Sequence, residues 1–384
     1  MADFSSLEGA LAYRGSHPSI ADIMPVVMKS WGVEGPAPQV RAQREHLESY
    51  LNLEQEAQVL VVLIDGLGYE LIMDHLPYAS FLRSRRADIL EGCTVLPSTT
   101  AAAITAFGTG LLPGLTRMVG WSVKDGQEVT SLITFEGATA TPEQWQPNPT
   151  LFEKAREAGT ASFAVMPAKF AGSGLTRAAL RGTTHVGAET FDDRITAAIQ
   201  KLREGAPVVY LYWSDLDHDG HGEGVDSNAW LAQFEIVDSA LARIARELPK
   251  GASAIVTGDH GMVNTSKATR VDVAQYPPLQ QGLEIIAGEG RAVHIHAKDG
   301  AKELLDRWER ALGERATIVR GVEENARVLG GEPGARLVGH ATAYMHGNWV
   351  AVDSRTQPQG MVNLKGVHGS FSHAELSIPI LRFA

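Results

Sequence analysis

The 384-residue sequence contains a single cysteine, Cys93, and this scarcity excludes two kinds of structure. One cysteine cannot form a disulfide within the chain, and it cannot supply the several thiolates of a metal cluster. We therefore expect Cys93 to be an ordinary buried apolar residue.

Long apolar runs are also absent from the sequence. No segment approaches the ~18 consecutive apolar residues that a membrane-spanning helix needs. Residues 1–5 show no basic stretch leading into an apolar run, which a signal peptide requires. These two absences predict a cytoplasmic protein that has no membrane partner.

Positive charge is in deficit, because 34 lysines and arginines stand against 45 aspartates and glutamates, for a net charge of −11. A nucleic-acid scaffold or a protein that binds anionic membranes needs basic patches, so this balance argues against both classes. A chain this acidic can still bind phosphate groups if bound metal ions supply the positive charge.

The composition that remains is that of a globular protein, with 44% hydrophobic and 21% charged residues. The chain is longer than a typical single domain. We therefore expect either a large α/β core with an insertion or two domains.

Residues 59–64 are six consecutive apolar residues, rich in valine, that run directly into Asp65 and Gly66. Such a run is typical of a strand at the centre of a parallel sheet that helices cover on both faces. Ligands of these sheets bind at the carboxyl ends of the strands, where Asp65 lies. The alternative is that Asp65 only forms a turn or caps the next helix.

Strand and helix patterns alternate after this segment, which predicts an α/β fold with a large parallel sheet. Strands are predicted at 87–95, 161–166, 207–213, 253–257 and 376–381, and helices at 69–76, 100–107, 149–157, 192–203 and 228–248. Residues 113–150 are rich in glycine, threonine and proline without a clear period, and we expect them to form a loop over one face.

The pattern changes between residues 270 and 335, where strands at 292–296 and 317–319 alternate with helices at 301–312 and 322–329. We expect 270–335 to be a small inserted α+β (βαβα) subdomain, with 1–269 and 336–384 forming the catalytic core. His294 and His296 alternate along one of these strands. Two histidines without a third ligand are more often structural than metal-binding.

Side chains of types that can bind metal ions follow several predicted strands. They are Asp65, Thr99 or Thr100, Asp217 with His221, Asp259 with His260, and His368. Carboxylate, imidazole and hydroxyl groups together suit zinc or manganese, whereas a calcium site uses oxygen ligands alone. The number of ligands is sufficient for two metal ions. Such a site would attract a phosphate ester despite the acidic composition.

These motifs, in this order and each after a predicted strand, resemble the alkaline phosphatase superfamily, and most of all its nucleotide pyrophosphatase/phosphodiesterase branch. The matching motifs are the strand that ends at Asp65, Pro97-x-x-Thr100, Asp217-x-x-Gly220-His221, Gly258-Asp259-His260-Gly261 and Gly366-x-His368-Gly369. They span residues 59–372. The resemblance implies a large, mostly parallel central sheet between helices and two divalent metal ions, zinc or manganese.

The resemblance also implies a role for each site residue. One metal ion is held by Asp65, Thr100, Asp259 and His260, and the other by Asp217, His221 and His368. Thr100 is selected over Thr99 as the nucleophile. The implied reaction is hydrolysis of a phosphodiester or pyrophosphate bond through a phosphothreonine intermediate, with a small-molecule phosphate ester or phosphonate as the substrate.

Three further residues are expected to contact substrate. Family members often carry an asparagine after the nucleophile helix, where it holds a phosphate oxygen, but residues 117–121 contain none. Trp121 is expected to stack on the substrate there, and Lys169 to hold a leaving-group phosphate or carboxylate. No arginine adjoins the site motifs to bind a monoester dianion, which predicts a preference for diesters, pyrophosphate linkages or phosphonates over simple monoesters. Arg117 is the residue best placed to reverse that preference.

Other functions stay open at this level. Within the superfamily they are a phosphonoacetate-type carbon–phosphorus hydrolase, a phosphomonoesterase and a phosphomutase, although the mutases generally use a serine nucleophile. A different class is a catalytically silent metal-binding protein. The oligomeric state is also left open.

Overall fold

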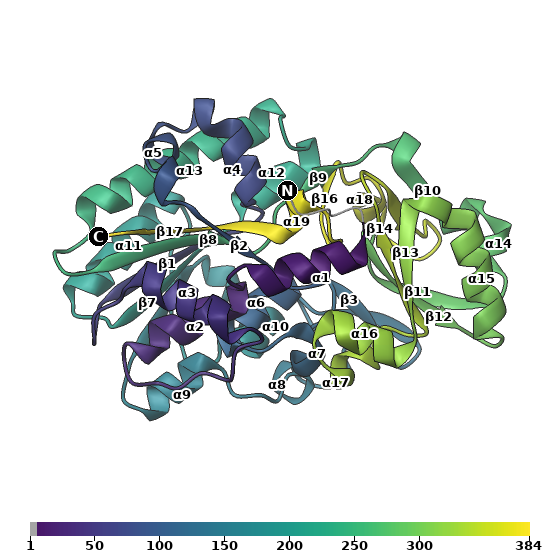
Figure 1. Ribbon diagram of the computed structural model, residues 1–384, viewed down its shortest axis with the longest axis horizontal. Coiled ribbons are helices and arrows are strands. Elements are labelled where there is room, and N and C mark those ends of the chain that lie inside the picture. The colour runs from purple at the N-terminus through teal and green to yellow at the C-terminus, as the bar shows by residue number, and fades with distance from the viewer. Residues whose placement is uncertain (1–5) are drawn as a thin grey trace.

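The computed structural model describes residues 6–384, and a seven-stranded sheet forms its centre (Figure 1). In spatial order the strands are β2 (Leu90–Cys93), β17 (Ser377–Phe383), β8 (Ser253–Gly258), β1 (Val59–Ile64), β7 (Val208–Trp213), β5 (Ser162–Met166) and β6 (Thr184–Gly187). Only β17 within this sheet runs antiparallel to its neighbours. The predicted mostly parallel sheet is therefore confirmed. Residues 1–5, on which the expectation of no signal peptide rested, lie outside the described residues.

Helices cover both faces of this sheet. Strand β1 is therefore buried on both faces, which explains why every residue in it is apolar. Leu60, Val62 and Ile64 enter one apolar core, and the alternate residues of the strand enter the other. The first core is closed by α4 (Tyr69–His75), α5 (Ser80–Ser84), α11 (Phe191–Arg203) and α13 (Asn228–Glu247). The second is closed by α2 (Ile20–Lys29), α3 (Arg41–Leu51), α6 (Thr100–Thr109) and α9 (Leu151–Glu157). Cys93 is buried, as expected.

The stretch 113–150, expected as a loop, contains regular structure. It forms α7 (Pro113–Thr116), a hairpin of β3 (Ser122–Asp125) and β4 (Glu128–Ser131), and α8 (Pro142–Trp145). Val123 is fully buried in an apolar cluster beneath this stretch. Tertiary packing thus stabilises a hairpin that is too short to show a clear period in the sequence.

A second sheet of four strands lies beside the core, at the right of Figure 1. Its order is β11 (Leu283–Glu289), β12 (Ala292–Ala297), β14 (Ala341–Met345) and β13 (Ala316–Arg320), with every pair antiparallel. The helices α15 (Ala301–Leu312) and α16 (Gly321–Leu329) accompany it. Trp308 lies in its apolar core and is fully buried.

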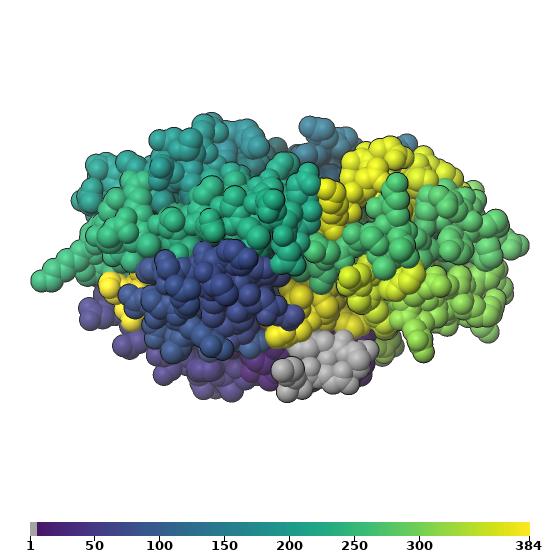
Figure 2. Space-filling view, turned by 90° about the horizontal axis from the view of Figure 1, so that it is seen from above, coloured from purple at the N-terminus to yellow at the C-terminus, as the bar shows by residue number. Residues whose placement is uncertain are grey.

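The small sheet differs from the expected βαβα unit in two respects. Strand β11 was missed because Glu284 interrupts its apolar residues near the start and Gly288 and Glu289 end it. Strand β14 lies beyond residue 335, yet it pairs with both β12 and β13, so the sheet extends past the expected boundary. The division of the chain into a core and an inserted subdomain remains a prediction. In the space-filling view, C-terminal residues in yellow lie between the core and the green small-sheet region (Figure 2).

Short elements complete the described chain. They include α1 (Leu7–Ser16), α10 (Gly174–Ala179), α12 (Asp215–Glu223), β9 (Val263–Asn264), β10 (Arg270–Asp272), α14 (Pro277–Gln280), α17 (Glu332–Ala335), β15 (Val350–Val352), α18 (Gln359–Val362), β16 (Gly366–Val367) and α19 (His373–Leu376). Among residues 6–384, no helix combines the length and the apolar character that crossing a membrane requires.

Candidate metal centre and active site

The seven residues that the sequence singled out as ligands come together at the carboxyl ends of the central strands. Asp65 follows β1, and Asp259 and His260 follow β8. Two groups of residues each bring their donor atoms within 4.8 Å of one another, and Asp217 belongs to both groups. They are Asp217, His221 and His368, and Asp65, Asp217 and His260.

Glycines let the backbone segments approach closely enough to build this cluster. Gly66 has φ of +74°, and a Cβ there would lie 3.0 Å from the Cβ of Asp217. A Cβ on Gly261 would lie 1.8 Å from the carbonyl oxygen of Ala374, a distance that no side chain tolerates. The Asp-Gly and His-Gly pairs of the motifs are therefore required by close packing as much as by turn geometry.

The three histidines of the cluster are oriented by the same kind of contact. The Nδ1–H groups of His221, His260 and His368 donate to the carbonyl oxygens of Gly366, Gly261 and Ser98, at 2.8, 2.9 and 2.9 Å. A carbonyl oxygen can only accept, so in neutral histidine each Nε2 is left with a lone pair. These Nε2 atoms face the cluster, and those of His221 and His368 are 3.3 Å apart. This orientation is typical of metal-binding histidines.

Each of the three aspartates has one carboxylate oxygen that is free to coordinate a metal ion. One oxygen each of Asp65, Asp217 and Asp259 is buried without a hydrogen-bond partner among the described residues. Burial, together with the charges of Asp259 and Asp217, raises the pKa of Asp65 well above its usual range. Burial raises the pKa of Asp259 as well. Unpaired carboxylate oxygens crowded beside imidazole lone pairs fit divalent cations such as zinc or manganese.

Asp217 and His221 are four residues apart on α12 and form a close pair. The Nε2 atom of His221 lies 3.2 Å from a carboxylate oxygen of Asp217. Although burial opposes the charge, this carboxylate raises the pKa of His221 to about 9. Burial also opposes the charge on Asp217, but the neighbouring histidines outweigh it and lower the pKa of Asp217.

The two candidate nucleophiles face different surroundings. Thr100 is the first residue of α6, and its Oγ1 lies 3.2 Å from Nε2 of His260. Thr99 precedes the helix, is buried, and lines a cavity beside the cluster. Thr100 is thus the threonine whose hydroxyl contacts the candidate metal ligands, at a helix end that favours negative charge.

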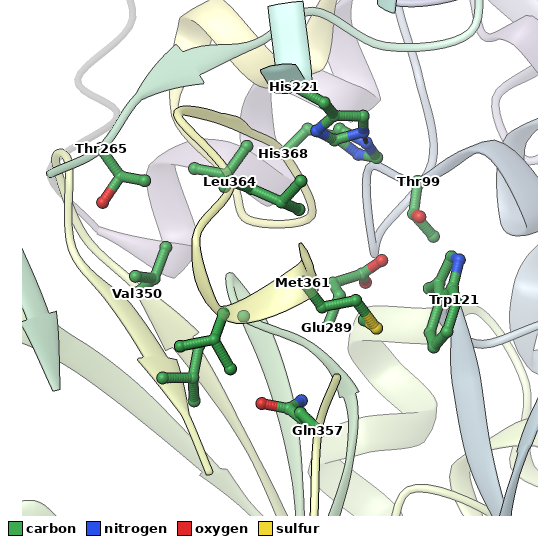
Figure 3. A pocket seen from close by; sticks show the side chains of 14 residues that line it. Thr99, Trp121, His221, Thr265, Glu289, Val350, Gln357, Met361, Leu364 and His368 are labelled. Carbon is green, nitrogen blue, oxygen red and sulfur yellow. Dashed lines mark hydrogen bonds between the residues drawn. The ribbon is translucent and has the colours of Figure 1, made fainter. Parts of the chain in front are cut away.

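The cavity beside Thr99 has a volume of about 240 Å³ and is also lined by His221 and His368 (Figure 3). Trp121 forms part of its wall, and its contact with substrate stays a prediction. Arg117 instead lines a separate cavity with Trp145 and Arg336. Lys169 is exposed and lies over the ring of Phe170 at 5.0 Å. The structure brings neither basic residue into the cavity beside Thr99.

Sequence reasoning missed Tyr212 and Ser98. Tyr212 is the penultimate residue of β7, and its hydroxyl donates to Asp65. The hydroxyl of Ser98 donates to the carbonyl of Ser370 at 2.6 Å and accepts from the amide of Gly369 at 3.1 Å. Ser98 thereby connects the turn before Thr100 to the loop that carries His368. The sequence signal for Ser98 was its position within the Pro97-x-x-Thr100 motif.

Sequence reasoning also missed Glu289, which ends β11 and lines the cavity. Its side chain is buried, and neither carboxylate oxygen accepts a hydrogen bond of normal geometry from the described residues. Burial raises the pKa of Glu289 to about 8, against weaker opposite effects of the Thr99 hydroxyl and the Trp121 backbone. An acidic residue at a strand end was a signal, but β11 itself was not predicted.

The chain matches the model of the family described as "Type I phosphodiesterase / nucleotide pyrophosphatase" over residues 59–371. A human protein, "Ectonucleotide pyrophosphatase/phosphodiesterase family member 5", is 30% identical over 94 residues. That match covers 23% of this chain and 20% of the relative, so the chain spans only about a fifth of that relative's length.

Solved structures share the fold. Murine ectonucleotide pyrophosphatase/phosphodiesterase 5 superposes with a TM-score of 0.66 at 20% identity, over 84% of this chain and 87% of the other. An inactive variant of that murine protein, in complex with AMP, gives 0.66 at 19% identity over the same shares. Phosphonoacetate hydrolase from Sinorhizobium meliloti, in complex with phosphonoformate, gives 0.64 at 16% identity, over 85% and 90%.

Proposed function

Because the chain belongs to the type I phosphodiesterase/nucleotide pyrophosphatase family, a family of hydrolases, we propose that it hydrolyses phosphodiester or pyrophosphate bonds with Thr100 as the nucleophile. The observation that carries this proposal is the contact of the Thr100 hydroxyl with His260, beside three carboxylates that each leave one oxygen unpaired. A threonine with no such surroundings would be too weak a nucleophile at neutral pH.

Two divalent metal ions, zinc or manganese, would be held by these residues. We propose Asp65, Thr100, Asp259 and His260 for one ion and Asp217, His221 and His368 for the other. When bound, such ions act as Lewis acids that lower the pKa of a coordinated hydroxyl and offset the charge of a phosphoryl group.

Several residues of the site have a distinct role in the proposed reaction. The Thr100 oxygen attacks phosphorus while the bond to the leaving alcohol breaks, which leaves a phosphoester on Thr100. The N-terminal amides of α6 face the phosphoryl oxygens and favour their negative charge. Tyr212, through its hydrogen bond to Asp65, holds that carboxylate in place. Water hydrolyses the phosphothreonine and restores the free hydroxyl.

We propose that diesters are preferred over monoesters. A monoester dianion carries an additional charge that an arginine commonly binds, and no arginine or lysine is among the residues that line the cavity beside Thr99. Arg117 lies on a different cavity, so its replacement by alanine should not change the ratio of kcat/KM for matched aryl diester and monoester substrates.

A phosphonoacetate-type hydrolase is the second candidate, because phosphonoacetate hydrolase shares the fold. A cytoplasmic location is also part of the proposal.

The test is turnover of bis(p-nitrophenyl) phosphate by metal-reconstituted protein. We expect chelation to abolish turnover and added zinc or manganese to restore it. Thr100→Ala should abolish turnover while the fold and most bound metal persist, since the other ligands remain. Thr99→Ala is the matched control and should be milder. If Thr99→Ala is the inactive variant and Thr100→Ala retains activity, the assignment of the nucleophile is wrong.

A further inference from the structure

A second cavity lies between α7, α8 and α17, which are near one another at the bottom of Figure 1. It shares no lining residue with the cavity beside Thr99, and its volume of about 480 Å³ is larger. A Cβ on Gly114 of α7 would lie 2.3 Å from the backbone nitrogen of Gly331, so α7 packs tightly against the turn before α17. We call this space the Arg117 cavity. It is lined by Arg117, Trp145, Glu332, Pro333, Arg336 and Leu337.

The charge of the Arg117 cavity is opposite to that of the whole chain. Two arginines and one glutamate line it, whereas the chain carries a net charge of −11. The glutamate, Glu332, is already paired with Arg336. The guanidinium of Arg117 makes no hydrogen bond or ion pair with any residue in the described part of the chain. One half-buried positive charge with five N–H donors therefore remains available to a ligand.

The backbone of Arg117 is a separate indication of a role for its side chain. Its φ of +65° lies in the left-handed region, which glycine adopts more easily than any residue with a Cβ. Two hydrogen bonds fix this conformation. The amide of Arg117 donates to the carbonyl of Pro113 at 2.9 Å, and its carbonyl accepts from the indole of Trp145 at 3.1 Å. Strain of this kind is more common at sites that bind ligands than elsewhere.

The rest of the wall is apolar and rigid. Trp145 is only 8% exposed and is held by an edge contact with Phe135, so its indole forms a fixed surface beside Pro333 and Leu337. We propose that the Arg117 cavity binds a small aromatic anion. Its carboxylate or phosphate group would accept hydrogen bonds from the guanidinium of Arg117, whose planar fork matches either group. Its ring would lie against the apolar surface. This binding site is separate from the proposed metal centre and requires no catalysis.

The test is isothermal titration calorimetry of the metal-reconstituted protein with 1-naphthoate and with 1-naphthylphosphonate. We expect one saturable site with a Kd of about 0.1–1 mM for a ligand of this size, and binding about tenfold weaker for the neutral 1-naphthylmethanol. Arg117→Gly removes the guanidinium and should fold, because glycine adopts a φ of +65° freely. It should weaken the binding of the anions about tenfold. The matched control, Arg156→Gln on the exposed surface of α9, should keep the wild-type Kd.

The two probes also separate the two kinds of anion. Binding of only one of them at the Arg117 cavity would support the inference and identify the group that the site takes. Any phosphonate held at the metal centre would stay bound in Arg117→Gly, so only the binding that this variant loses is assigned to the cavity. If Arg117→Gly does not fold, Pro333→Glu decides, because a carboxylate at this exposed position would repel both anions. Absence of saturable binding, or equal affinity in wild type and Arg117→Gly, would overturn the inference. Neither result involves turnover, so the proposed function would be unaffected.

Discussion

Replacing Glu375 by glutamine should destabilise the protein and disturb the active site together. Arg291 donates to both carboxylate oxygens of Glu375, at 3.0 and 2.6 Å, and both side chains are fully buried. The same carboxylate accepts from the amide of Ser370 at 2.9 Å. The carbonyl of Ser370 accepts from the hydroxyl of Ser98, two residues before Thr100, so the Arg291–Glu375 pair supports the loop that carries His368.

The size of the effect follows from the burial of the pair. Removing one partner of a buried ion pair costs about 3–5 kcal/mol, because the other charge stays buried. Arg291 keeps close contacts with the carbonyls of Gly347 and Trp349, at 2.6 and 2.7 Å, which favours the lower end of that range. With about 2.1 cal/mol/K of unfolding entropy per residue and 384 residues, about 3 kcal/mol corresponds to a fall in Tm of about 4 °C.

The assay is thermal unfolding followed by circular dichroism or calorimetry, at equal metal content. Glu8→Gln is the matched control, because Glu8 pairs with Arg327 on the exposed surface, where ion pairs contribute roughly 0–1 kcal/mol. Adding Arg291→Met to Glu375→Gln should recover part of the lost stability, since no unpaired charge is then buried. A Glu375→Gln variant as stable as wild type would refute the reasoning.

The remaining predictions concern hydrogen bonds and pH. Tyr212→Phe should lower the free energy of unfolding by about 1–3 kcal/mol, because it leaves a buried carboxyl oxygen of Asp65 without its hydrogen bond. Tyr210→Phe on the same strand should be nearly neutral, since the Tyr210 hydroxyl has no partner among the described residues; urea unfolding of both variants checks this. His373 lies 2.5 Å from Glu70 and 2.7 Å from Glu91, and although burial opposes its charge these carboxylates raise its pKa to about 9. The stability that His373 contributes should therefore be complete below pH ~6.5 and should be lost as the pH rises through about 9. Urea unfolding of the wild type and of His373→Gln checks this. The difference between their urea midpoints should become smaller as the pH rises over that range.

The central sheet was predictable because its strands are buried on both faces. In β1 every residue is apolar, and the sequence therefore shows the strand without any knowledge of its neighbours. The clustering of the candidate metal ligands was predictable for a related reason. The strands β1 and β8 end at one edge of a parallel sheet, so Asp65 and Asp259 had to lie near one another.

The small sheet was harder because antiparallel pairing joins segments that are distant in the chain. Strand β14 pairs with β12, which lies more than forty residues earlier in the chain, and no local sequence pattern predicts that pairing. Glu289 was hidden for the same reason, since its relation to Thr99 depends on how the small sheet packs beside the core. Tyr212 was hidden because an aromatic residue in a buried strand normally contributes to the apolar core.

The proposal that Thr100 is the nucleophile is tested most directly by acid-quenching the enzyme during turnover of a slow aryl diester and mapping the modified peptide by mass spectrometry. We expect a phosphoester adduct on Thr100 that is absent from the chelator-treated enzyme and from Thr100→Ala. An adduct on another residue, or turnover without any adduct under single-turnover conditions, would contradict the proposed covalent mechanism.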